Sequence, residues 1–294
     1  MHGTPAAEIN IDEPLIRALL REQHPDLAHL PCVPVDVGWD NVMVRLGESL
    51  CLRLPRRTVA ATLIENEQAW LPGLSKVLPL PTPAPLRVGL PGCGYPWRWS
   101  IVPWLAGDAA DLAPPASSEA TRLGAFLKAL HIPAPAAAPS NPARGPLQER
   151  AARIEERMQR LAAMSAPVVT SDIYRVWEAA LTASIDVGPT WLHGDFHARN
   201  VLVKDGVLTG VIDWGDITAG DRATDLAAIW MLFAEPEARS QALISSGSVT
   251  QATYLRAKGW AVGFGVILLD SGLVDHPRHA AMGAKTLQRV IEGP

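Results

Sequence analysis

The stretch that decides the fold runs from Trp191 to Trp214 and reads WLHGDFHARNVLVKDGVLTGVIDW. It contains two short apolar segments, VLV and LTGVI, joined by a turn at Lys204-Asp205-Gly206. Asp-Gly between two apolar segments is typical of a β-hairpin. An antiparallel hairpin brings its two ends together, so we expect Asn200, before the first strand, to lie within a few ångströms of Asp213, after the second.

The polar residues of this stretch suit phosphoryl transfer. The pattern His193-x-Asp195, followed by Asn200 and then by Asp213-x-Gly215, provides one carboxylate on a loop and two further oxygen ligands. Phosphoryl transfer needs a carboxylate that meets the acceptor hydroxyl, and hard oxygen ligands that hold Mg²⁺ on the nucleotide phosphates. We therefore predict that Asp195 is the catalytic base and that Asn200 and Asp213 are Mg²⁺ ligands. A surface hairpin with merely solvated acids is the alternative, and it leaves the shared spacing of the three groups unexplained.

The segments HGDFHARNVL and VIDWGD resemble the catalytic and metal-binding motifs of the aminoglycoside phosphotransferase family, small-molecule relatives of the protein kinases. The resemblance covers nearly the full chain and is most specific in the catalytic half. It implies an α+β, protein-kinase-like fold of two lobes. Residues 1–104 would form a small antiparallel sheet lobe that binds the nucleotide, and residues 105–294 a larger, mostly helical lobe that binds the acceptor.

The same resemblance implies the reaction and its partners. ATP or GTP, with Mg²⁺, would supply the γ-phosphoryl group, and a small-molecule hydroxyl would accept it. The acceptor expected first is an aminoglycoside or another antibiotic, which would make the protein a resistance enzyme. A kinase of a macrolide, choline, homoserine or a sugar would keep every motif and differ only in residues 133–185 and 255–280. A non-catalytic nucleotide-binding module is a second alternative, but it would be expected to lose Asp195 or Asp213, and both are present.

Composition and charge exclude several other classes of protein. A chain of 294 residues is long enough for about two domains, and its net charge of −4 with a pI near 6.1 argues against a nucleic-acid or anionic-membrane partner. The N-terminal segment has no basic region leading into an apolar one, and no apolar run approaches the roughly 20 residues of a membrane span. Three scattered cysteines fit free thiols in a reducing compartment. We expect a cytoplasmic protein, monomeric or homodimeric, with no membrane partner.

The first lobe is predicted from its periodicity. Asp12 is expected to cap a helix at 12–23, and the period of two over 33–54 predicts strands that turn at Gly47-Glu48. A helix at 58–77 and an apolar strand at 97–104 follow. Gly38-Trp39-Asp40-Asn41 takes the position where kinases fold a loop over the phosphates, but it lacks the repeated glycines and reads equally well as a hairpin turn.

Nucleotide-binding residues in this lobe are implied by the resemblance. Arg53 takes the place of the lysine that kinases present to the phosphates, and Glu67 that of its acidic partner. Arginine differs from lysine in shape, which leaves nucleotide affinity and the choice between ATP and GTP open. Glu65 is a rival that would point to another helix face, so only one of the two can pair with Arg53. The nucleotide base is expected near the end of the apolar strand, at Val102, Trp104 and Leu105. The same local sequence is also compatible with an edge strand that ends in a turn.

The second lobe is predicted to be mainly helical. We expect helices at 118–131, 147–164, 170–184 and 260–269 and a final helix after a turn at 275–277, with an irregular loop at 133–146. Asp225 is expected to accept N–H or imidazole hydrogen bonds that fix the catalytic loop, and His131 to cap or pack. Asp221 is expected to cap a helix, and Asp216 to contact the metal or the acceptor. Asp270 and Asp275 could meet a cationic acceptor or could cap helices.

Overall fold

The computed structural model describes residues 6–37, 40–165 and 168–293. It has the expected mixture of an antiparallel sheet part and a mainly helical part. The chain forms two compact units, of which the first comprises Met1–Val77, Pro81–Ala106 and Asp213–Gly215 and the second Leu78–Leu80, Gly107–Ile212 and Asp216–Pro294. The sequence analysis predicted one boundary, after residue 104. In the structure the first unit also contains the segment 213–215, and the second unit also contains the segment 78–80.

The first unit contains a five-stranded sheet with the strand order β1-β2-β3-β5-β4, in which all neighbours are antiparallel. The sheet strands are β1 (Cys32–Val37), β2 (Asn41–Leu46), β3 (Leu50–Pro55), β4 (Arg87–Gly89) and β5 (Trp99–Pro103). The turn between β2 and β3 uses Gly47, whose φ is +61°. The alternating sequence pattern of 33–54 is therefore confirmed as strands.

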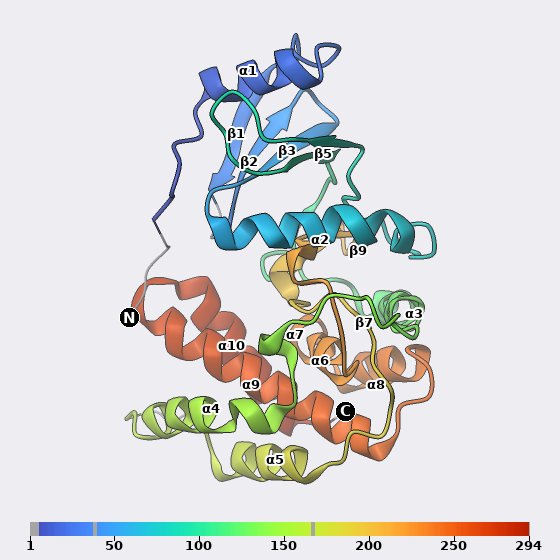
Figure 1. Cartoon of the computed structure of the whole chain (residues 1–294). Coiled ribbons are helices and arrows are strands. Elements are labelled where there is room, and N and C mark those ends of the chain that lie inside the picture. The colour runs from blue at the N-terminus through green and yellow to red at the C-terminus, as the bar shows by residue number, and fades with distance from the viewer. Residues whose placement is uncertain (1–5, 38–39, 166–167, 294) are drawn as a thin grey trace. The chain divides into compact units, whose positions relative to one another are not determined.

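Two helices, α1 (Glu13–Gln23) and α2 (Thr58–Leu74), lie on opposite sides of this sheet (Figure 1). Asp12 caps α1 as expected, because its side chain accepts a hydrogen bond from the Leu15 N–H at 3.0 Å. Leu52 and Leu54 of β3 are buried in one core cluster with the apolar face of α1. Side chains alternate along a strand, so Arg53 points to the other face, toward α2.

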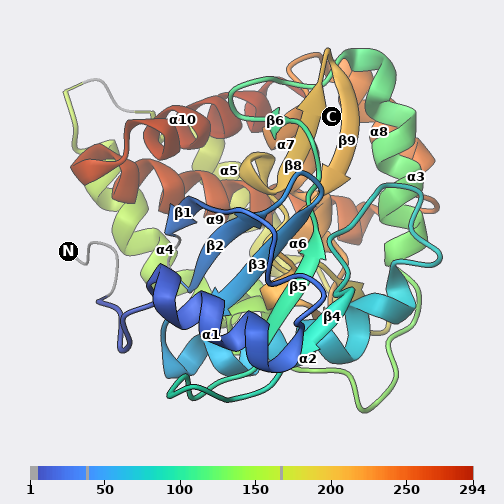
Figure 2. The same ribbon diagram turned by 90° about the horizontal axis from the view of Figure 1, so that it is seen from above.

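The second unit is built around a long helix, α9. Its helices are α3 (Ala120–Leu130), α4 (Leu147–Ala162), α5 (Ser171–Thr182), α6 (Ala223–Leu226), α7 (Ala228–Leu232), α8 (Pro236–Ser245), α9 (Gln251–Asp275) and α10 (Pro277–Ile291). Helices α9 and α10 run side by side in both views (Figures 1 and 2), and α4, α5 and α6 also pack on α9.

Helix α9 begins nine residues earlier than its apolar run predicts, at Gln251 instead of Trp260. The Thr250 side chain accepts a hydrogen bond from the Thr253 N–H at 3.0 Å and so caps the helix before that run starts. Among the described residues, α9 is the one helix long and apolar enough to cross a membrane, and 67% of its most apolar window is buried inside the fold. Its apolar composition is thus explained by its place in the core.

The strands of the second unit carry the motif that opened the sequence analysis. They are β6 (Asp108–Ala109), β7 (Thr190–Leu192), β8 (Val201–Lys204), β9 (Val207–Val211) and β10 (Thr218–Gly220). β8 and β9 form the predicted hairpin, with Val201 opposite Val211 and a turn of positive φ at Asp205 and Gly206. The pairing extends one step further, where the Ile212 N–H donates to the Asn200 carbonyl at 2.8 Å.

Candidate active site

In the first unit, Arg53 forms ion pairs with two carboxylates. Its Nη1 lies 3.1 Å from Glu67 Oε2, and its Nη2 donates to Asp213 Oδ1 at 2.7 Å. Glu65 lies 3.9 Å from Arg98 and is more than half exposed, whereas the Glu67 side chain is fully buried. The structure thus identifies Glu67, and not Glu65, as the partner of Arg53.

Burial dominates the electrostatics of this group. Burial raises the pKa of Glu67 to about 7, although the positive charge of Arg53 opposes the shift. Burial alone would lower the pKa of Arg53, but the charges of Glu67 and Asp213 raise it above its usual value. Arg53 therefore stays protonated and is held in one place. A guanidinium group is a donor that suits phosphate oxygens, although both Nη groups of Arg53 are paired with carboxylates here.

Asp213 is held in a left-handed backbone conformation, with φ of +62°. Aspartate is one of the few residues other than glycine that adopt this conformation without severe strain. Its side chain remains 55% exposed even though Oδ1 is paired with Arg53. The second carboxylate oxygen is thus available to a ligand from solvent.

In the second unit, buried Asp225 fixes the loop that follows β7. Its Oδ2 accepts a hydrogen bond from the His193 N–H at 2.7 Å, and its Oδ1 accepts one from the Gly194 N–H at 3.0 Å. His131 Nε2, at the end of α3, lies 3.5 Å from the same carboxylate. The expected support role of Asp225 is confirmed, and His131 is the packing residue that the sequence analysis favoured.

Gly194 is required by the geometry of this loop. Its φ is +84°, and a Cβ built on it would lie 2.3 Å from the Asp216 carbonyl oxygen. A side chain at this position would therefore clash with backbone as well as adopt a rare conformation. The Asp216 side chain accepts a hydrogen bond from Asn141 Nδ2 at 2.6 Å.

Asp195 lies at the end of this loop and is surrounded by hydrogen-bond donors. Arg144 Nη2 donates to Oδ1 at 3.1 Å, and His197 Nε2 lies 3.3 Å from Oδ2. Asn200 Nδ2 donates to the Asp195 carbonyl at 2.9 Å and approaches Oδ2 at 3.4 Å. The side chain is 28% exposed, so it remains accessible to a small molecule.

These contacts keep the Asp195 carboxylate ionised. Burial would raise its pKa, but the charge and the hydrogen bond of His197, with the charges of Arg144 and His193, bring it below its usual range. Such a carboxylate is a weak base that can accept and orient the hydrogen of a hydroxyl group. This property suits a reaction in which the attacking oxygen needs little deprotonation in the transition state.

The predicted Mg²⁺ ligands have suitable donor atoms. Asn200 uses its amide nitrogen for Asp195, which leaves its Oδ1 as an oxygen ligand, and Asp213 has a carboxylate oxygen open to solvent. Amide and carboxylate oxygens are the hard ligands that Mg²⁺ prefers. In the described part of the chain there is no cluster of three His, Cys, Asp or Glu side chains that could hold a metal by itself.

The expected nucleotide-base segment contains one residue with an uncommitted backbone. Val102 is buried and paired with Cys51 in the sheet, and the Trp104 N–H donates to the Ser49 carbonyl at 2.7 Å. Leu105 forms no backbone hydrogen bond with any described residue. Its N–H and C=O groups are the ones that could bond the edge of a base.

Sequence reasoning missed two residues that contact Asp195. Arg144 lies in the stretch 133–146 that was expected to be an irregular loop, and only a contact across 51 residues brings it to Asp195. His197 could have been found, because HGDFH places it two residues after Asp195. Gly38 and Trp39 of the expected phosphate loop lie outside the described residues.

Asp270, which was considered for a cationic acceptor, is paired within the protein. It accepts hydrogen bonds from Arg157 at 2.6 Å and from Arg160 at 2.9 Å, so arginine neutralises its charge. Asp221, which was expected to cap a helix, accepts a hydrogen bond from the Ala223 N–H at 3.1 Å at the start of α6, and another from Arg256 at 2.6 Å.

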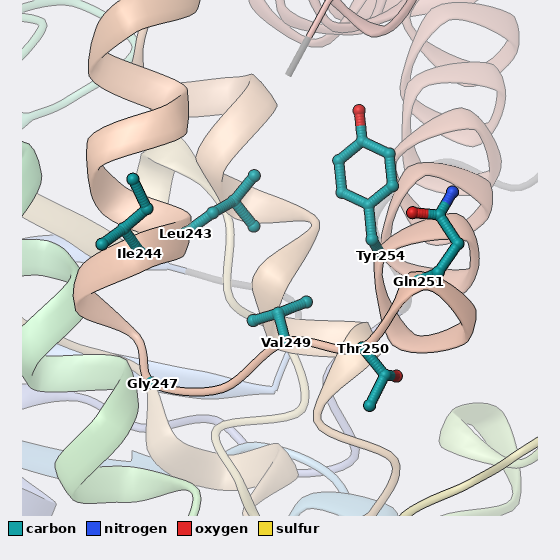
Figure 3. Close-up of a pocket in the computed structure, with 7 residues that line it drawn as sticks. All are labelled: Leu243, Ile244, Gly247, Val249, Thr250, Gln251 and Tyr254. Carbon is teal, nitrogen blue, oxygen red and sulfur yellow. The ribbon is translucent and has the colours of Figure 1, made fainter.

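A surface pocket of about 460 Å³ lies where α8 leads into α9 (Figure 3). Leu243 and Ile244 line one side, and Gln251 and Tyr254 line the other (Figure 3). None of the predicted site residues lines it, and it contains no carboxylate or histidine. The pocket is therefore separate from the residues that could perform the chemistry.

Comparison with known proteins agrees with this description. No curated protein matches the chain. The GDP complex of wild-type aminoglycoside 2'-phosphotransferase-IIIa is similar in structure, with a TM-score of 0.66 at 16% identity over 96% of this chain and 99% of that one. The macrolide 2'-phosphotransferase MphH from Brachybacterium faecium gives a TM-score of 0.58 at 20% identity, covering 93% and 97% of the two chains. A macrolide 2'-phosphotransferase type I gives 0.57 at 24% identity, covering 95% and 98%. The profile of the phosphotransferase enzyme family matches residues 31–260, and the chain belongs to that family.

Proposed function

We propose that this protein transfers the γ-phosphoryl group of ATP or GTP to a hydroxyl group of a small molecule, with Mg²⁺ as the cofactor. The observation that carries the proposal is the ionised carboxylate of Asp195, accessible at the end of a loop that Asp225 fixes and close to the amide of Asn200. Family membership and the nucleotide complexes of the structural neighbours support it.

Each residue has a distinct part in the proposed reaction. The acceptor hydroxyl donates a hydrogen bond to Asp195, which orients its oxygen toward the γ-phosphorus. A bond forms between that oxygen and the γ-phosphorus while the bond from the γ-phosphorus to the β–γ bridging oxygen breaks, and the nucleoside diphosphate leaves. The hydroxyl proton passes to Asp195 late in the transfer and then to solvent.

The nucleotide is proposed to be held by the first unit. Arg53, fixed by Glu67, would contact the phosphate oxygens, and the backbone of Leu105 would bond the base, near Val102 and Trp104. Asn200 and Asp213 would hold Mg²⁺, which neutralises charge on the phosphates when bound. Catalysis then comes mainly from positioning and charge neutralisation.

The acceptor is proposed to be an antibiotic or a metabolite alcohol. Aminoglycosides and macrolides are the acceptors in the names of the structural neighbours and are the first compounds to test. Choline, homoserine and sugars are the alternatives that would use the same catalytic residues. A panel of these compounds, assayed for nucleoside diphosphate release with ATP and with GTP, addresses both open questions.

An Asp195→Asn variant tests the proposed base. We expect turnover to fall by about 10²- to 10⁴-fold, as for the loss of a general base, with nucleotide affinity changed by less than about threefold. Asp205→Asn, in the exposed hairpin turn, is the matched control and should retain full activity. Unchanged turnover in Asp195→Asn would refute the assignment.

A further inference from the structure

Within the second unit, the guanidinium group of Arg144 lies beside the proposed base, and that of Arg150 lies next to Arg144. Arg144, in the short 3₁₀ turn Pro142–Arg144, donates from Nη2 to Asp195 Oδ1 at 3.1 Å. Its Nη1 also lies 3.4 Å from the Ala143 carbonyl oxygen, and Arg150 Nη1, on α4, donates to the same oxygen at 2.5 Å. A shared acceptor atom places the two positive charges next to each other.

Two aromatic rings of α9 lie beneath these guanidinium groups. The Arg144 Cζ is 5.5 Å from the Phe264 ring centroid, and the Arg150 Cζ is 5.9 Å from that of Trp260. The two rings are one helical turn apart, with centroids separated by 5.7 Å. Cation–π attraction holds the two guanidinium groups on α9, where their positive charge could attract an anionic ligand.

The protein balances only part of the positive charge of this pair. Asp195 is the only carboxylate among the described residues that lies within ion-pair distance of either guanidinium group. The Nε–H groups of Arg144 and Arg150 are both buried without a hydrogen-bond partner in the described part of the chain. Burial, together with the charges of Arg144, Arg153 and Arg157, lowers the pKa of Arg150. An anion at this place would relieve the repulsion between the two guanidinium groups.

A second set of basic groups follows the catalytic loop. Arg199 Nη1 lies 2.5 Å from His279 Nε2, and His279 stacks on His276 with ring centroids 3.8 Å apart. Burial and the positive charges of His276, Arg199 and His197 lower the pKa of His279 to about 4. His279 is therefore neutral near pH 7, and Arg199 is the member of this group that adds positive charge beside the loop.

We infer that the acceptor carries an anionic group, a carboxylate or a phosphate, which Arg144 and Arg150 bind while the acceptor hydroxyl reaches Asp195. Arg144 both belongs to the anion subsite and donates a hydrogen bond to Asp195. It therefore fixes the distance between the anionic group of the acceptor and the hydroxyl that reaches Asp195. The inference rests on the proposed function and narrows its substrate class. A polycationic aminoglycoside would meet like charge here, which weighs against it as the natural acceptor.

The binding test compares matched compounds on matched variants. The probes are a series of hydroxycarboxylates, the corresponding hydroxyalkyl phosphates, the primary amides of the acids, and kanamycin as the polycation, each titrated calorimetrically. Arg150→Gln removes one charge from the subsite, and Arg153→Gln removes the same charge from an exposed position of the same helix. Arg150→Lys retains the charge without the fork of donors. Thermal unfolding verifies that the variants fold.

We expect anionic probes to bind wild type and Arg153→Gln alike and to bind Arg150→Gln at least about tenfold more weakly, the loss of one hydrogen bond to a charged group. Arg150→Lys should be intermediate, and the amides should be insensitive to all three changes. The carboxylate and phosphate series identify which anion the subsite takes. Absence of Arg150-dependent binding in both series, or preferred binding of kanamycin, overturns the proposal.

A turnover assay on the same panel separates this proposal from the function on which it rests. Arg150-dependent binding of anions without any phosphoryl transfer would support the subsite and contradict transfer to such hydroxyl compounds. Transfer that is equally fast to acids and amides, and unchanged in Arg150→Gln, would support the function and contradict the subsite.

Discussion

Replacing Asp225 by asparagine should loosen the catalytic loop without removing any group that touches a substrate. The Asp225 side chain is fully buried, and its two oxygens accept the N–H groups of His193 and Gly194 at 2.7 and 3.0 Å. Asparagine has nearly the same shape but only one acceptor oxygen. Its NH₂ group would face one of the two N–H donors, so that hydrogen bond is lost. The other N–H would donate to a neutral amide oxygen instead of a charged carboxylate oxygen.

The size of the effect follows from these contacts. A hydrogen bond to a charged group is worth about 1.5–3 kcal/mol, and a buried donor without a partner costs a similar amount. We expect a total loss of about 2–4 kcal/mol. Since 1.36 kcal/mol corresponds to a factor of ten, amide exchange at His193 and Gly194 should become about 30- to 1,000-fold faster if these amides exchange by local opening.

Hydrogen exchange followed by mass spectrometry or NMR measures this change at the two amides. Thermal unfolding should shift downward by about 5–15 °C, given roughly 2–4 °C per kcal/mol for a protein of this size class. Asp205→Asn is the control, because the hairpin turn is exposed and asparagine tolerates its left-handed backbone. Exchange rates within about twofold of wild type in Asp225→Asn would show that the carboxylate does not hold the loop.

Three further substitutions test the packing around the site. The pKa of Glu67 is raised from 4.5 to about 7, so the stability that its protonated form contributes is complete below pH 4.5 and is lost as the pH rises through 7. Over that range the unfolding free energy of wild type should fall by up to about 3 kcal/mol, and that of Glu67→Gln, which cannot ionise at this position, should not show this fall. Parallel pH profiles of unfolding free energy for the two proteins would contradict that. Gly194→Ala, at φ +84° and against a carbonyl oxygen, should cost more than about 2 kcal/mol, whereas Gly188→Ala, with open space around it, should be neutral in thermal unfolding. Gly283→Ala, whose Cβ would lie 2.5 Å from the backbone of α9, should cost about 1–3 kcal/mol, and a value equal to that of the unhindered helix control Gly73→Ala would contradict the close approach of α9 and α10.

Local pattern and spacing predicted the elements that carry the chemistry. The hairpin at 201–211, the strand that contains Arg53 and the helix that contains Glu67 all follow from hydrophobic periodicity and turn residues. The support role of Asp225 also followed from its place at the start of an apolar helix. The choice between Glu65 and Glu67 could not be made from the sequence. It depends on which face of the helix packs against the sheet, and the local pattern did not decide that.

Long-range contacts account for what sequence reasoning missed. Arg144 reaches Asp195 from a stretch rich in proline and alanine, which has no periodicity to reveal its direction. The positions of Trp260 and Phe264 looked like ordinary core residues of an apolar helix, and they are indeed buried. Their contacts with two arginines depend on the packing of α4 and the 142–144 turn on α9, which no local pattern encodes.

The division of the chain has a practical consequence for gene fragments. The main part of the first unit ends at Ala106, but Asp213–Gly215, from the far side of the hairpin, belongs to that unit as well. A recombinant piece that stops at residue 106 would remove Asp213, one of the two carboxylates that pair with the buried guanidinium of Arg53 among the described residues, and would leave Glu67. Split-protein designs and isolated nucleotide-binding fragments of this chain should therefore supply residues 213–215 in trans or by circular permutation.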